Sequence, residues 1–197
     1  MGDKEIKSAF EIAMEKLEKI GSSTEEERTE WKYVPEGEKL GVRYIKEDFD
    51  LFGALNGFSG DARKYVTQGV TEILIRNIGL PRTEIAKKTN KKAMDILKML
   101  KNDKVKTEAV LTQFRRLFDH YATQGDQQRK QAYMSLKADF EDRLQDATKQ
   151  QGLAMVGKID VEKQPQFLQE WHKMQSQLDS QYLTLISEYK RELTAIS

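Results

Sequence analysis

Few residues in this chain have the types and spacing needed for chemistry. None of the 197 residues is cysteine, and the two histidines are His120 and His172. Without thiols the chain can form no disulfide framework, no Cys-ligated zinc or iron–sulfur site and no thiol nucleophile. Neither histidine has the Glu-x-x-His partner of carboxylate di-metal bundles. If a helical hairpin turned near residues 152–160, His120 would lie near Ala195 and His172 near Arg143, roughly 35 Å apart along the hairpin axis. We therefore expect no metal, no cofactor and no catalytic residue.

Three closely spaced glycines precede an apolar helical pattern that begins at Asp61. Gly53, Gly57 and Gly60 could let backbone N–H groups cradle an anion at the start of that helix. The segment lacks the Gly-Lys-Ser/Thr ending of a P-loop, and the carboxylate of Asp61 would repel an anion. The glycines therefore favour an ordinary turn.

The strongest charge feature is a group of lysines. Residues 82–106 hold nine basic and three acidic residues, whereas residues 1–60 hold nine basic and fourteen acidic residues, and the whole chain has a net charge of +1. A lysine patch of this kind could neutralise phosphates. Recognition of bases or single strands would add aromatic residues or arginines, and none lies among these lysines. The alternative is that the lysines are solvated or complement the acidic N-terminal arm. The predicted anion-binding residues are Lys87, Lys88, Lys91 and Lys92.

Apolar residues recur at helical intervals over most of the chain and predict an all-α fold in three segments. Residues 1–60 would hold an N-terminal amphipathic helix, over 6–20, and a loosely ordered acidic arm. Residues 61–102 would hold a shorter central helix pair, over about 61–78 and 83–100. Residues 103–197 would form a long antiparallel helical hairpin, because two long helices with a short link pack side by side.

The segment 22–60 carries the weakest pattern. Thr24, followed by three glutamates, could open a short acidic helix, since negative charge suits a helix N-terminus. Alternating residues at 31–33 and 42–44 flank Pro35-Glu-Gly37, a pattern typical of a small β-hairpin. We expect mostly irregular structure here. The side chains expected to hold it in place are Trp31, Tyr33 and Phe49.

The hairpin would begin near residue 104, and its second helix would begin near Pro165, where proline suits a first turn. The polar stretch 123–131 leaves open whether the first helix of the hairpin breaks at Gly125 or continues. Continuation is favoured, because most of these residues are good helix formers and none is proline. Residues at core spacing predict packing and interaction positions, and these are Phe114, Phe118, Tyr121, Trp171, Leu178, Tyr182 and Tyr189.

The stretch Ile159–Trp171, with the later Gln181-Tyr182 and Glu188-Tyr189-Lys190, resembles a family of uncharacterised bacterial helical proteins. The resemblance falls mainly on residues 159–190 and extends more loosely to residues 75–81. It supports the placement of the helices and implies no functional residues.

The longest aliphatic runs are triplets such as residues 73–75, far short of a signal peptide or of the roughly 20 apolar residues of a spanning helix. We therefore expect a cytoplasmic protein with no membrane partner. The function expected is that of a non-enzymatic interaction or scaffold protein built on an exposed hairpin, with an unidentified protein or a second copy as partner. The alternative is binding of nucleic acid or another polyanion through the lysines at 87–92.

Overall fold

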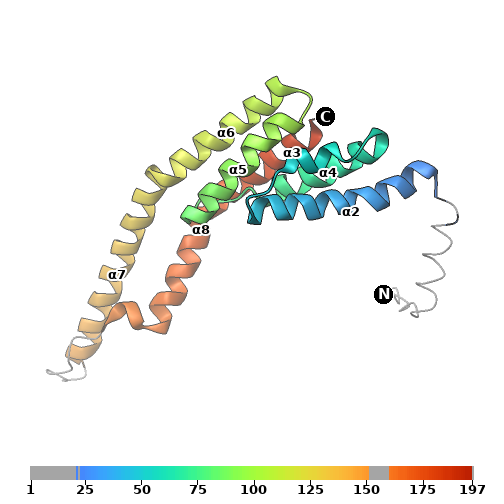
Figure 1. Ribbon diagram of the computed structural model, residues 1–197. Helices are drawn as coiled ribbons and strands as arrows, with labels where there is room; N and C mark the ends of the chain where they lie inside the picture. The colour runs from blue at the N-terminus through green and yellow to red at the C-terminus, as the bar shows by residue number, and fades with distance from the viewer. Residues whose placement is uncertain (1–20, 22, 151–159, 197) are drawn as a thin grey trace, which may run out of the picture. The chain divides into compact units, whose positions relative to one another are not determined.

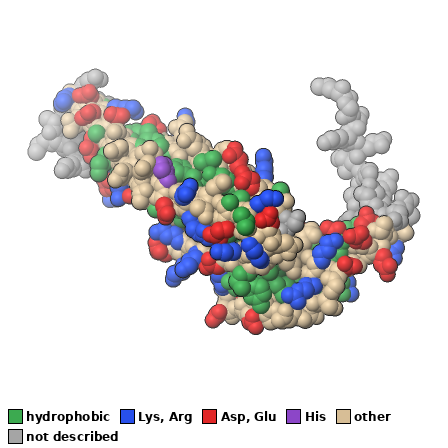
Figure 2. Space-filling model, turned by 90° about the horizontal axis from the view of Figure 1, so that it is seen from above, with side chains coloured by type: hydrophobic (Ala, Val, Ile, Leu, Met, Phe, Trp, Pro, Cys, Tyr) green, Lys and Arg blue, Asp and Glu red, His purple; other side chains and the backbone are tan. Residues whose placement is uncertain are grey.

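A computed structural model describes residues 21, 23–150 and 160–196 of the chain (Figure 1). All regular elements in this described part are helices and none is a strand, which confirms the predicted all-α class. The predicted helix over 6–20 lies outside the described residues. The chain divides into two compact units, Met1–Asn77 and Ile78–Ser197, with the boundary directly after one helix. On the face that Figure 2 presents, basic and acidic side chains are interspersed and hydrophobic side chains form small patches between them.

The first unit contains α2 (Glu25–Lys46), α3 (Leu51–Asn56) and α4 (Gly60–Asn77). A capping box starts α2: the backbone N–H of Glu27 donates to the Thr24 hydroxyl, and the backbone N–H of Thr24 donates to the Glu27 carboxylate. Together these bonds satisfy two backbone donors that a helix start would otherwise leave without acceptors. The predicted helix start at Thr24 is therefore correct.

The expectations of mostly irregular structure over 22–60 and of a β-hairpin around Pro35 are wrong, because residues 25–46 form α2 and residues 51–56 form α3. Pro35 lies inside the helix with its side chain exposed, so it removes one backbone hydrogen bond without disturbing buried packing. Gly37 and Gly41 are the buried residues of α2, and they are helical contact points rather than turn residues.

The glycines let α2 and α4 cross with their backbones in contact. A Cβ added at Gly37 would lie 2.0 Å from the carbonyl oxygen of Val66, and one added at Gly69 would lie 2.1 Å from that of Val34. Any side chain larger than hydrogen would therefore push the helices apart. Close approach between the helices explains why both positions carry glycine despite its low helix propensity.

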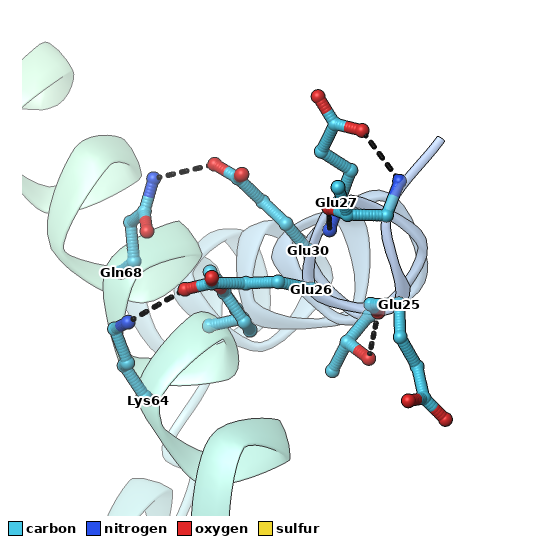
Figure 3. Close-up of polar contacts among 9 residues, drawn as sticks. Glu25, Glu26, Glu27, Glu30, Lys64 and Gln68 are labelled. Carbon is cyan, nitrogen blue, oxygen red and sulfur yellow. Dashed lines mark hydrogen bonds and ion pairs between the residues drawn. The ribbon is translucent and has the colours of Figure 1, made fainter. Parts of the chain in front are cut away.

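Polar contacts line the crossing near the start of α2 (Figure 3). The Tyr65 hydroxyl donates to the Glu26 carboxylate at 3.0 Å, and the ammonium of Lys64 lies 3.5 Å from the same carboxylate. The Gln68 amide donates to Glu30 at 3.4 Å. Glu26 and Glu30 of α2 are thus matched by donors on α4, within a single unit.

The second unit contains α5 (Glu84–Leu100), α6 (Lys104–Ala122), α7 (Gln124–Gln150), the 3-10 helix η1 (Val161–Lys163) and α8 (Pro165–Ala195). Local signals place the helix starts. The side chains of Thr83 and Asp103 accept hydrogen bonds from backbone N–H groups in the first turns of α5 and α6, and Pro165 occupies the first turn of α8. The helix α8 packs against both α6 and α7, which forms the hairpin predicted for this part of the chain.

The expectation of a continuous helix through residues 123–131 is wrong. The first helix of the hairpin breaks at Thr123, whose φ of −106° and ψ of −83° lie outside the helical region. The break precedes Gly125, which is buried against α8. A Cβ at Gly125 would lie 2.7 Å from the Tyr182 hydroxyl oxygen, so glycine here permits close packing of α7 on α8.

The register of the hairpin also differs from the expected one. His120 is hydrogen-bonded to Tyr182, with 2.9 Å between Nδ1 and the hydroxyl oxygen, rather than lying near Ala195. The 3-10 helix η1 packs on the middle of α7, where Lys137 pairs with Glu162 at 2.6 Å. As a result α8 begins beside the middle of α7 rather than beside its end.

Candidate interaction surface

Five of the predicted packing residues lie where α6 meets α8. The ring of Phe114, which is fully buried, lies 5.3 Å from that of Tyr189 and 5.8 Å from that of Phe118, measured between centroids. Tyr121 stacks edge-on against Tyr182 at 5.0 Å. Leu178 is half-buried on the same helix as Tyr182. These side chains stabilise the hairpin, and the buried ones among them offer little area to a partner.

A cluster of charged and polar residues surrounds the helix break. The guanidinium of Arg82 donates to the Asp179 carboxylate at 2.6 Å, and the side chain of Asp179 is only 3% exposed. Arg129 lies over the Tyr121 ring at 4.0 Å and donates to the Tyr121 carbonyl oxygen at 3.0 Å. These contacts join the segment before α5, the end of α6, the start of α7 and the middle of α8.

The surroundings of the cluster raise the pKa values of Arg82 and Tyr121. Burial disfavours the charged guanidinium of Arg82, but hydrogen bonds with Asp179 and Tyr121 outweigh that effect, so the pKa of Arg82 is raised. Burial also raises the pKa of the Tyr121 phenol, and the nearby Asp179 carboxylate adds to the shift. Arg82 and Tyr121 therefore stay protonated at neutral pH. The protonated guanidinium donates to Asp179, and the protonated phenol adds no negative charge beside that carboxylate.

The outer part of the hairpin, where α7 pairs with the first half of α8, has a small core of its own. Its buried members are Leu136, Phe140, Val161 and Phe167. Tyr133 is half-buried beside this core, with its ring 5.5 Å from Phe167 and 5.0 Å from Trp171.

Two large apolar side chains next to this core remain in solvent. Met134 is 68% exposed on α7, and Leu168 is 44% exposed on α8. Tyr133 and Phe167 contact each other, and Met134 and Leu168 are the residues that directly follow them in the sequence. Because successive helical residues are rotated by about 100° and the two helices run in opposite directions, Met134 and Leu168 turn toward the same face of the hairpin. We call Tyr133, Met134, Leu168 and Trp171 the hairpin patch.

The four predicted lysines all lie on α5, which buries its opposite side through residues such as Ala93 and Leu97. Lys87 pairs with Glu84 at 2.6 Å, and Lys92 is half-buried. Lys88 and Lys91 are exposed and form no ion pair with the residues that the structure describes. The structure thus brings the four side chains to one helix but leaves only part of their charge unopposed.

The glycine segment before α4 offers no open anion cradle. Gly53 lies in α3, where its backbone N–H donates to the carboxylate of Asp50 at 2.9 Å. The side chain of Asp50 already occupies that position, and Gly53 belongs to a short helix rather than to the expected turn. In the described part of the chain no group of three or more His, Asp or Glu side chains could hold a metal ion. Over the same residues, no helix is both long enough and apolar enough to cross a membrane.

Sequence reasoning missed the polar cluster and the hairpin patch. The available signal for the polar cluster was a charged residue at the edge of an apolar stripe, because Asp179 directly follows Leu178 on α8. The exposed residues Met134 and Leu168 had no comparable signal, because a lone apolar residue beside a seam is common on helix surfaces.

The model of a family of unknown function (DUF6657) matches residues 52–195, which is more than half of the chain. The matched range includes both stretches, 75–81 and 159–190, on which the resemblance to an uncharacterised family was based, and it confirms that resemblance. Neither the curated proteins nor the solved structures contain a significant match to the chain.

Proposed function

We propose that this chain, which belongs to that family of unknown function, is a non-enzymatic protein-interaction or scaffold protein that engages its partner through the hairpin patch. The observation that carries the proposal is the pair of exposed side chains Met134 and Leu168 beside the contact between Tyr133 and Trp171.

The composition of the hairpin patch supports this function. Aromatic residues and methionine are enriched at protein interfaces relative to the rest of a protein surface. In such interfaces a few central aromatic anchors supply most of the binding free energy. The hairpin patch combines two half-buried aromatic rings with two flexible apolar side chains, and it can therefore both anchor and adapt to a partner.

The architecture of the outer hairpin supports it as well. Two helices bury only the edges that face each other, so each keeps the rest of its circumference in solvent. Charges around the hairpin patch are largely paired within the chain, as Lys137 is with Glu162 and Arg143 with Glu170 at 4.0 Å. A partner would thus meet apolar surface bordered by paired charges, which can stay hydrated at the polar rim of an interface.

The test compares three forms of the full chain: wild type, the double variant Met134→Ser/Leu168→Ser, and a control, Leu183→Ser. Leu183 is 48% exposed on α8 and lies outside the hairpin patch. Each form is used in pull-downs with quantitative mass spectrometry, and each is examined by light scattering for self-association. Circular dichroism verifies that all three remain helical.

The proposal requires a captured protein, or a dimer, that is lost with the double variant and retained with Leu183→Ser. Equal capture and equal mass for all three forms would contradict it. Turnover of a small substrate by the purified protein would contradict the non-enzymatic part.

The second candidate function is binding of a polyanion through Lys87, Lys88, Lys91 and Lys92. It is supported by the exposed ammonium groups of Lys88 and Lys91, which form no ion pair with any residue in the described part of the chain. Such binding would weaken steeply as salt is raised, because it depends on the release of counterions. A titration with nucleic acid at rising salt tests it, and binding that does not weaken would contradict it.

A further inference from the structure

The solvent-facing side of α5 carries apolar side chains as well as lysines. Ile85 is 78% exposed and Met99 is 58% exposed, which are high values for such large apolar side chains. Ile85, Lys88, Lys92 and Met99 follow one another at intervals of three, four and seven residues. That spacing places all four along one side of the helix. We call this set, together with Lys91, the α5 face.

The charge of the α5 face is positive after its internal pairs are considered. Lys87 is neutralised by Glu84 on the same helix, and Lys98 pairs with Glu108 of α6 at 3.0 Å. Lys88 and Lys91 form no ion pair with the residues that the structure describes, whereas Lys92 has an interaction of its own, and Asp95 is the remaining acidic residue of α5. The surface therefore offers net positive charge between two apolar side chains.

We propose that the α5 face docks an acidic amphipathic helix of a partner protein. A polyanion alone would satisfy the lysines but would leave Ile85 and Met99 in water. Single-stranded nucleic acid is bound through aromatic stacking and arginine, and the α5 face has neither. A peptide with both apolar and acidic residues matches every side chain of the surface, as amphipathic helices do when they lie along a groove or face.

The spacing of the α5 face specifies the partner further. Ile85 and Met99 are fourteen residues apart, which is roughly 21 Å along a helix. The partner helix would therefore carry apolar residues about four turns apart, with acidic residues between them that meet Lys88 and Lys91. Complementary charge would accelerate association and set the orientation of the two helices.

This inference goes beyond the function proposed for the hairpin, because it concerns a different surface of the second unit. If the hairpin patch bound no partner, the inference about the α5 face would not be affected. Conversely, failure of the α5 face to bind would not affect the hairpin.

The test is a fluorescence anisotropy titration of the full chain with three labelled probes. The first is a helical peptide with leucines fourteen residues apart and three glutamates between them. The second is the same peptide with glutamine in place of each glutamate. The third is a single-stranded oligonucleotide with the same net charge as the first peptide.

Two variants separate the contributions of charge and apolar contact: Lys88→Gln/Lys91→Gln and Ile85→Ser/Met99→Ser. Their matched controls are Lys173→Gln and Leu183→Ser, both at exposed positions of α8. Circular dichroism is recorded for every form, so that a loss of binding is read only from folded protein.

The inference predicts that the acidic peptide binds most tightly and that each double variant weakens its binding by about tenfold, which corresponds to about 1.4 kcal/mol. The controls should bind as the wild type does. Tighter binding of the oligonucleotide, or an unchanged dissociation constant for Ile85→Ser/Met99→Ser, would overturn the inference in favour of polyanion binding. Absence of binding by all three probes would also overturn it.

Discussion

Replacing Gly69 by alanine tests the crossing of α2 and α4 directly. The new Cβ would lie 2.1 Å from the Val34 carbonyl oxygen and 2.9 Å from the Glu38 nitrogen, whereas ordinary contacts of a Cβ begin at 3.4 Å. The nearest distance is thus too short by about 1.3 Å, and the obstructing atoms are backbone atoms that cannot rotate away. The helices must separate, which forfeits a quarter to a half of the dispersion attraction across their contact.

The expected loss follows from two opposing effects. Overpacking of this kind costs about 3 kcal/mol, at the upper end of its usual range, because a backbone rather than a side chain must move. Alanine is favoured over glycine inside a helix by about 1 kcal/mol. Gly69→Ala should therefore lower the free energy of unfolding of the first unit by about 2 kcal/mol.

The other glycines of this unit provide a graded series. Gly37→Ala should match Gly69→Ala, because its Cβ would lie 2.0 Å from the Val66 carbonyl oxygen. Gly41→Ala should cost less, since its nearest atoms are side-chain carbons of Ile73 at 3.0 and 3.1 Å. Gly57→Ala is the matched control: it meets one atom at 3.3 Å and has a φ of −70° that alanine adopts readily.

The assay is urea unfolding followed by tryptophan fluorescence. The chain has two tryptophans, Trp31 in α2 and Trp171 in α8, so a Trp171→Phe background leaves a reporter in the first unit alone. The urea midpoint should fall in the order set by the Cβ distances, with an unchanged denaturant slope. If Gly69→Ala and Gly37→Ala unfold at the same urea concentration as Gly57→Ala, the close crossing is refuted.

Three further measurements address other parts of the chain. Arg82→Ala should lower stability by about 3 kcal/mol in thermal melts, because it leaves the buried Asp179 carboxylate without its cation; adding Asp179→Asn should recover part of the loss, and no recovery would argue against the pair. Hydrogen bonds from Arg115 and a neighbouring lysine hold the pKa of Glu108 below its ordinary value of 4.5, so its stabilising effect is present above that value and is lost as the pH falls through the lower folded-state pKa. Urea midpoints should therefore fall less between about pH 7 and about pH 3 for Glu108→Gln than for the wild type, and identical pH profiles would contradict this role. Pro35→Ala should raise the stability of the first unit by about 1–3 kcal/mol, because it restores a helical N–H donor at an exposed position; a lower urea midpoint would show that the proline is required for packing.

Helix starts were predictable from a few neighbouring residues. Thr83 and Asp103 cap their helices with their own side chains, and Pro165 occupies a first turn, so the chemistry that sets each start is local. Prediction failed at Pro35 and Gly37, which are local turn signals in isolation. There the close fit against α4 outweighs local preference, and only the partner helix reveals it.

The candidate surfaces were predictable to different degrees. The spacing of Phe114, Tyr182 and Tyr189 correctly indicated residues that face one another across a hairpin, but the register depended on η1 folding onto α7. Met134 and Ile85 differ little in sequence context from apolar residues that are buried. Their exposure depends on which faces of α7 and α5 the neighbouring helices cover.

By itself the sequence determined the all-α class, most helix boundaries and the absence of thiol chemistry, because composition, capping and apolar period act over one or two helical turns. Only the tertiary structure decided the crossing at Gly37 and Gly69, the break at Thr123, the partner of Asp179 and the side chains left in solvent. Each of these depends on contacts between residues distant in the chain, and the free energy of such contacts exists only once the helices have packed.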